Sequence, residues 1–148
     1  MYNRFSGDPA IQITENGATM KFIGGQPVMD QGLENAVQIS LFTKLGYWGN
    51  ALVNEESKKI GSKYQRERTI IDVDTVNEVS EDASNALKWM SDTNLLSDIN
   101  INTTNPAGNQ LSTSIELFPP GQDSYNFIFT KNGLSWIGQQ ENPAHERF

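Results

Sequence analysis

Residues 72–94 read DVDTVNEVSEDASNALKWMSDTN and contain the clearest structural element of the chain. Apolar residues recur at every third or fourth position, as on the buried stripe of an α-helix. Asp74 or Thr75 can cap the amino end, and Glu78 lies in the first turn. The sequence therefore predicts an amphipathic helix that ends near Asn94. Its stripe consists of Val76, Val79, Ala83, Ala86, Leu87 and Met90.

Downstream of this helix the apolar period changes to two, which is typical of half-buried strands. Three such runs are predicted, at residues 99–104, 111–117 and 125–129. Turn-forming residues separate them, NPAG at 105–108 and PPG at 119–121. The runs therefore predict a three-stranded antiparallel meander whose last strand is aromatic.

Upstream of the long helix, residues 10–23 alternate around Asn16-Gly17, a pair that tolerates the positive φ angles of a tight turn. This pattern predicts a β-hairpin. Asp30 can cap a helix over residues 31–43, whose apolar residues lie on more than one side and predict a central, buried position. Residues 62–68 begin with a capping-box pattern and predict a further short helix.

These elements predict an α+β fold with an N-terminal β-hairpin, two or three helices and a C-terminal three-stranded antiparallel meander. The chain has 148 residues, of which 36% are hydrophobic, and this size predicts a single domain over residues 1–148. Residues 44–61 contain three glycines without sustained periodicity and predict an ordered surface loop. Residues 134–148 are expected to form an extended tail.

The composition excludes several kinds of chemistry. The chain has no cysteine and a single histidine, His145, so disulfides, thiolate zinc sites and multi-histidine metal sites are excluded. A net charge of −7 argues against binding to nucleic acid. No apolar run approaches the roughly 20 residues of a membrane-spanning helix. We therefore expect no metal, no cofactor, no nucleic-acid partner and no membrane partner.

One carboxylate invites a catalytic interpretation. Glu34 lies between the apolar residues Leu33 and Val37, where a carboxyl group could stay protonated and act as the general acid of a glycoside hydrolase. A glutamate in the first turn of a helix is explained more simply by the helix dipole. No second carboxylate is marked by its context. We therefore expect that the protein is not an enzyme.

Charge is distributed unevenly along the chain. Five of the 11 basic residues fall within eleven positions, whereas residues 72–98 hold seven acidic residues and one base, Lys88. Such polarity belongs either to a solvated face or to oppositely charged patches that orient docking in an assembly. The candidate docking residues are Lys58, Lys59, Lys63, Arg66 and Arg68.

Aromatic residues in loops and tails are typical of interface anchors. Trp48 lies in the loop segment Tyr47-Trp48-Gly49, and Trp136 lies in the tail that begins at Leu134. Packing over the protein's own sheet edge is the alternative interpretation, and glycan binding through Trp48 and Trp136 is a third.

The aromatic strand offers another candidate contact. Tyr125, Phe127 and Phe129 alternate with polar residues at the end of the predicted meander. If this strand lies at a sheet edge, its unpaired backbone groups can template pairing with another chain.

Three runs carry a resemblance to a known family: DQGLENAVQISLFT at 30–43, YWGN at 47–50 and IGS at 60–62. They resemble the Mu-like baseplate proteins of contractile-tailed phages, a branch of the sheath-initiator, or wedge, superfamily. The resemblance covers about residues 11–101. It implies a structural subunit in a six-fold ring around the tail tube, linking the baseplate wedge to the first sheath ring.

The resemblance also implies partners and a location. The partners would be other wedge proteins and the sheath protein, whose arms pair with edge strands of the sheet, and possibly the tail tube or hub. The location would be the tail baseplate of the virion, with host cytoplasm during assembly. Wider members carry Glu-Pro-Arg where this chain has Leu96-Ser97-Asp98-Ile99, so docking through that tripeptide is not transferred. Some wedge relatives have been labelled lysozymes, which makes a small tail-associated peptidoglycan hydrolase the alternative function.

Overall fold

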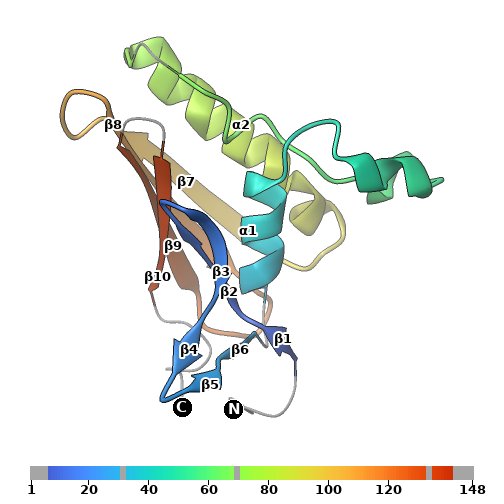
Figure 1. Ribbon diagram of the computed structural model, residues 1–148. Helices are drawn as coiled ribbons and strands as arrows, with labels where there is room; N and C mark the ends of the chain where they lie inside the picture. Colours follow the sequence, from blue (N-terminus) through green and yellow to red (C-terminus); the bar gives the residue numbers. More distant parts are fainter. Residues whose placement is uncertain (1–6, 31–32, 69–70, 133–134, 142–148) are drawn as a thin grey trace.

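Figure 1 shows an α+β fold in which two helices and small hairpins lie against one antiparallel sheet. The computed structural model describes residues 7–30, 33–68, 71–132 and 135–141. The predicted α+β class is confirmed. In chain order the elements are β1 (Asp8–Pro9), β2 (Ile11–Thr14), β3 (Gly17–Met20), β4 (Phe22–Ile23), β5 (Gln26–Pro27), β6 (Met29–Asp30), α1 (Glu34–Phe42), η1 (Trp48–Leu52), η2 (Glu56–Lys58), α2 (Val73–Asp92), β7 (Asp98–Thr104), β8 (Gln110–Phe118), β9 (Tyr125–Asn132) and β10 (Ser135–Glu141).

The main sheet has four strands in the order β10-β9-β8-β7, and every neighbouring pair is antiparallel. The register places Ile101, Ile115 and Phe127 side by side across three strands. Ile115 and Phe127 are buried against the helices, so this face is the core face. The opposite face carries mostly Asn, Ser and Thr side chains. Alternation with a period of two therefore separates the two faces as expected.

The C-terminal third differs from the sequence-based prediction in two ways. The meander has a fourth strand, because residues 135–141 of the expected tail form β10, which pairs with β9. Residues 125–129 are consequently not an edge, since β9 lies between β8 and β10. Trp136 and Gly138 of β10 point to the core face, and this explains why the segment pairs instead of extending away. Leu134 and residues 142–148 lie outside the described residues.

Helix α2 is the predicted amphipathic helix, but it starts two or three residues earlier than the predicted caps Asp74 or Thr75 allow. Asp72 is the N-cap, where its carboxylate accepts hydrogen bonds from the backbone N–H of Thr75 (2.8 Å) and from the Thr75 hydroxyl (2.9 Å). These hydrogen bonds lower the pKa of Asp72. Val79, Ala83, Leu87 and Met90 are fully buried. The stripe therefore packs onto the sheet as its spacing predicts.

Helix α1 is shorter than predicted and less apolar on its buried side. Asp30, which precedes the helix, caps its N-terminal backbone, since the N–H of Asn35 donates to Asp30 Oδ2 (2.9 Å). Ile39 is 43% exposed, so the predicted burial on more than one side is wrong at that position. Polar groups of the helix bind the N-terminal hairpin instead: Asn35 Oδ1 accepts from the N–H of Ile11, and Gln38 Nε2 donates to the Ile11 carbonyl, both at 2.9 Å.

The N-terminal region contains more pairing than one hairpin. Strands β2 and β3 pair with Thr14 opposite Gly17, so the turn residues are Glu15 and Asn16, one position earlier than predicted. Gly24 and Gly25 connect β4 to β5 in a second hairpin, and β1 pairs with β6.

Residues 62–68 form a turn and not the predicted short helix. The Ser62 side chain, expected to cap, donates to the carbonyl of Leu41 (2.9 Å) and accepts from the N–H of Tyr64 (3.3 Å). Ser62 thereby ties this segment to the carboxyl end of α1, and the turn inserts Tyr64 into the core, where it is fully buried. Desolvation raises the pKa of the Tyr64 phenol.

Candidate protein interface

Residues 44–61 leave the body of the protein and return to it at one place, and we call them the lobe. Lys44 and Ser62 form a parallel bridge at its base, and the N–H of Ser62 donates to the Thr43 carbonyl (2.8 Å). Gly61 closes the base with a φ of +133°, where a Cβ would lie 2.8 Å from the carbonyl oxygen of Lys44. A side chain at position 61 would therefore disrupt the base. In Figure 1 the lobe projects beyond the two helices.

The lobe has an internal clamp that holds its two short 3₁₀ helices, η1 and η2. The Asn50 side chain accepts from the N–H of Ile60 (2.9 Å) and donates to the Ile60 carbonyl (2.7 Å). One amide thus satisfies both backbone groups of a residue ten positions away. The predicted ordered loop is confirmed as a structured excursion of the chain.

We expect Asn50→Ala to loosen the lobe while the sheet and α2 keep their structure. The variant loses two neutral hydrogen bonds, so the free energy of local opening should fall by about 1–2 kcal/mol. Faster amide hydrogen exchange at Ile60 and earlier proteolytic cleavage within residues 44–61 would report this opening. Asn54→Ala is the matched control, because Asn54 is an exposed asparagine in the same lobe. Equal exchange in both variants would contradict the clamp.

The lobe exposes large apolar side chains. Trp48 is 74% exposed and Leu52 is 79% exposed, and Leu45 is exposed beside them in sequence. Tyr47 packs against Trp48 with ring centroids 5.5 Å apart. Gly49 leaves room for the Tyr47 ring, which a Cβ at position 49 would overlap. The predicted segment Tyr47-Trp48-Gly49 is therefore a preformed surface feature, of the kind that anchors interfaces.

The five candidate basic residues fall into two groups. Lys58, Lys59 and Lys63 are on the surface. Lys58 pairs with Glu55 (3.5 Å) and Lys59 with Glu56 (2.9 Å), contacts whose exposure makes them weak. These three lysines remain available to a partner, whereas the two arginines are engaged within the chain.

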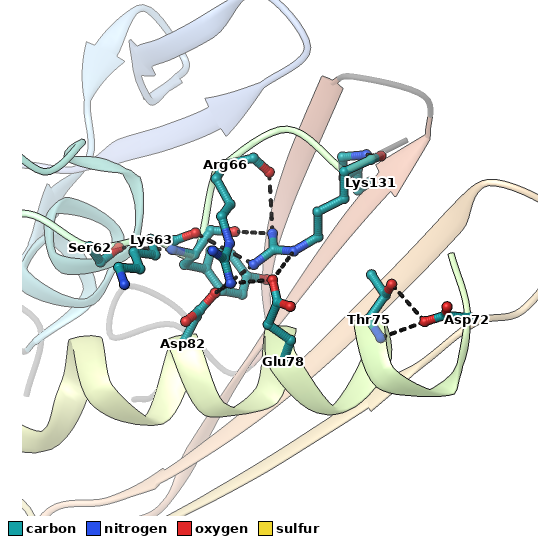
Figure 2. A network of polar contacts seen from close by, with 10 residues as sticks. Ser62, Lys63, Arg66, Asp72, Thr75, Glu78, Asp82 and Lys131 are labelled. Carbon is teal, nitrogen blue, oxygen red and sulfur yellow. Dashed lines mark hydrogen bonds and ion pairs between the residues drawn. The ribbon is translucent and has the colours of Figure 1, made fainter. Parts of the chain in front are cut away.

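The arginines bind acidic residues of α2. Arg68 is buried, and its guanidinium lies 2.6 Å from Asp82 Oδ2 and donates to the Tyr64 carbonyl (2.7 Å). Arg66 pairs with the same carboxylate at 3.1 Å and with Glu78. Figure 2 shows Glu78 and Asp82 rising from α2 toward Arg66. Burial lowers the pKa of Arg68, and the Asp82 carboxylate opposes that shift. These contacts fasten residues 62–68 to the helix.

The aromatic candidates of the sheet are inside the protein. Phe127 and Phe129 are buried on the core face of β9 with stacked rings 5.6 Å apart. Trp136 is 7% exposed and lies 4.8 Å from the Tyr64 ring. Of the two alternatives for Trp136, the structure shows packing on the protein's own sheet. The Tyr125 side chain and Leu134 lie outside the described part of the chain.

Glu34, the residue with a catalytic interpretation, lies in the first turn of α1. Its side chain is buried, and it lines neither the groove between α2 and β7 nor the small hollow between β2 and β10. Within residues 7–30, 33–68, 71–132 and 135–141, no three acidic or histidine side chains gather as metal ligands would. Neither described helix is long and apolar enough to cross a membrane.

Comparison with known families decides the affiliation. A model of the family described as phage protein GP46 matches residues 33–124, which is more than half of the chain. This chain belongs to the phage protein GP46 family. No curated protein and no solved structure gives a significant match. The GP46 match begins directly before α1, includes the lobe, α2, β7 and β8, and ends just before β9. The lobe is therefore part of the GP46 region, whereas the N-terminal hairpins and the strands β9 and β10 lie outside it.

Proposed function

We propose that this GP46-family chain is a non-enzymatic structural subunit of a contractile phage tail baseplate, where it links wedge proteins around the tube to the first sheath ring. Membership of a phage protein family supports the viral setting. The likeness of residues 30–43, 47–50 and 60–62 to Mu-like baseplate proteins supports the particular place in the tail. The proposed location is the virion, with assembly in the host cytoplasm.

The observation that carries this proposal is the open main sheet. Its outer strands are β7 and β10, and neither is hydrogen-bonded to a further strand among the described residues. An edge strand of this kind presents backbone N–H and C=O groups that an arm of another chain can pair with. The strand predicted for this contact, residues 125–129, is internal, so the arm of the other chain would pair with β7 or β10.

The molecule would then have two binding surfaces. The sheet edges would receive arms of the sheath protein, and the helical side with the lobe would face other baseplate subunits. Wedge proteins, the sheath and possibly the tube or hub are the proposed partners in a six-fold assembly. No cofactor or catalytic residue is assigned.

Site-specific crosslinking in assembled tails tests the proposal. Because the natural chain has no cysteine, each introduced cysteine is a unique attachment point for a photoreactive maleimide. Asn102→Cys on β7 and Gln139→Cys on β10 place the probe at exposed positions of the two outer strands. We expect at least one of them to crosslink to the sheath protein, whereas Asn77→Cys on the exposed side of α2 should not. Tails that lack this chain, or that give no sheath crosslink from either strand, would refute the proposed function.

A further inference from the structure

The lobe differs in charge from the rest of the molecule. Residues 44–61 contain three lysines and two glutamates, and Lys63 follows directly, so this part is positive in a chain with a net charge of −7. It also exposes about three quarters of Trp48 and of Leu52. A positively charged lobe with apolar side chains at its surface fits a partner whose groove combines apolar with acidic side chains.

The same chain carries such a groove. It runs between α2 and the outer strand β7 and has a volume of about 490 Å³. Ile99 and Ile101 of β7 supply its apolar lining, and small side chains of α2 such as Ser84 leave the space open.

The charges that line the groove complement the lobe. Glu81 and Asp98 contribute carboxylates, and Lys88 contributes one positive charge. In the part of the chain that the structure describes, neither carboxylate pairs with a basic side chain. The groove therefore keeps a negative balance with which lysines of another molecule can interact.

The lobe of a molecule does not occupy that molecule's own groove. None of the groove-lining residues belongs to residues 44–61. The lobe extends from the carboxyl end of α1, whereas the groove belongs to α2 and β7, and in Figure 1 the lobe points away from the sheet. Among the described residues neither surface covers the other, so one copy can use both at the same time.

We propose that the lobe of one copy docks into the α2–β7 groove of a second copy, with Trp48 and Leu52 against Ile99 and Ile101. The lobe lysines then lie near Glu81 and Asp98. A contact between two different surfaces is heterologous, so successive copies join head to tail and form a ring when the rotation closes. This self-association goes beyond the proposed function, which assigns contacts with other proteins only.

Sedimentation velocity of the purified full chain over a range of concentrations tests the contact. We expect wild-type protein to form concentration-dependent oligomers. Trp48→Ala/Leu52→Ala removes the apolar side chains of the lobe, and Ser84→Trp fills the groove, so each should weaken self-association by about tenfold or more. Ile137→Ala and Asn85→Trp are the matched controls, since both positions are exposed but line neither surface. Circular dichroism of each variant checks that it is folded.

A mixing experiment separates this geometry from any symmetric dimer. The Ser84→Trp variant retains its lobe, and the Trp48→Ala/Leu52→Ala variant retains its groove. Mixed together, the two should form a dimer that grows no further, although each is monomeric alone. Failure of the mixture to associate, or wild-type protein that stays monomeric at all concentrations, would overturn the proposal.

An anionic lipid surface is the alternative partner of the lobe, because tryptophan and lysine side chains also suit such a surface. Co-sedimentation with vesicles of phosphatidylcholine and phosphatidylglycerol distinguishes the two. Trp48-dependent vesicle binding by a protein that does not self-associate would assign the lobe to lipid and refute the contact between copies. Monomeric protein that still crosslinks to sheath in tails would refute this inference and leave the proposed function intact.

Discussion

Asp82→Ala should lower the free energy of unfolding by about 3–5 kcal/mol, because it removes the shared partner of two arginines. Arg68 and Arg66 lie 2.6 and 3.1 Å from the same Asp82 oxygen. Arg68 is almost completely buried, so loss of the carboxylate removes its nearest counter-charge and leaves only the half-exposed Glu78, whose Oε1 lies 3.6 Å from Arg68 Nε. Urea unfolding followed by circular dichroism measures the difference.

Two further variants serve as controls for that measurement. Glu81→Ala changes the neighbouring carboxylate of the same helix, which is exposed, and should alter stability by no more than about 0.5 kcal/mol. Arg68→Met/Asp82→Leu removes both charges and should recover much of the lost stability, since the buried guanidinium is then absent together with its nearest carboxylate. An Asp82→Ala protein as stable as the Glu81→Ala protein would show that the ion pairs do not hold residues 62–68 on α2.

The arginine network also shows where charge counting along a sequence stops being informative. Lys58, Lys59, Lys63, Arg66 and Arg68 form one basic run in the sequence. The fold divides it, because the turn that inserts Tyr64 into the core carries the two arginines over α2. Spacing predicts that the charges are near one another, but only the tertiary contact decides which of them face solvent.

Much of the fold follows from periodicity. The stripe of α2 and the alternation in β7, β8 and β9 are long enough to indicate both the element type and the buried face. The cap of α2 is less determined, because Asp72, Asp74 and Thr75 are all good N-cap residues and the chain uses the first. The residues of strand β10 carry no clear strand pattern, because Trp136 and Gly138 give its core face only one large apolar side chain.

The candidate interface is predicted in part. The ordered lobe with exposed Trp48 follows from its glycines and its lack of periodicity. The alternation of Phe127 and Phe129 indicates a buried face without indicating what buries it, so the sequence alone is compatible with an interface as well as with the core. The α2–β7 groove had no sequence signal, since its lining comes from two elements that meet only in the folded protein.

Phe129→Ala should lower the free energy of unfolding by about 3–5 kcal/mol, as expected for a large side chain removed from a packed core. The Phe129 ring lies 5.2 Å from Phe42 and 5.6 Å from Phe127, measured between ring centroids. Gly138 of β10 lies directly over it, since a Cβ there would come within 2.8 Å of Phe129 Cε1. This close fit leaves little room for neighbours to fill the cavity without moving β10.

Phe22→Ala provides the matched control, because Phe22 is 55% exposed in the small hairpin of β4 and β5. It should change stability by less than about 1 kcal/mol in the same urea titration. An interface role for Phe129 makes the opposite prediction: its alanine variant would keep the stability of the isolated protein and lose only assembly with partners. A large loss of stability in the isolated chain therefore assigns Phe129 to the core, and an unchanged unfolding midpoint would assign it to the surface.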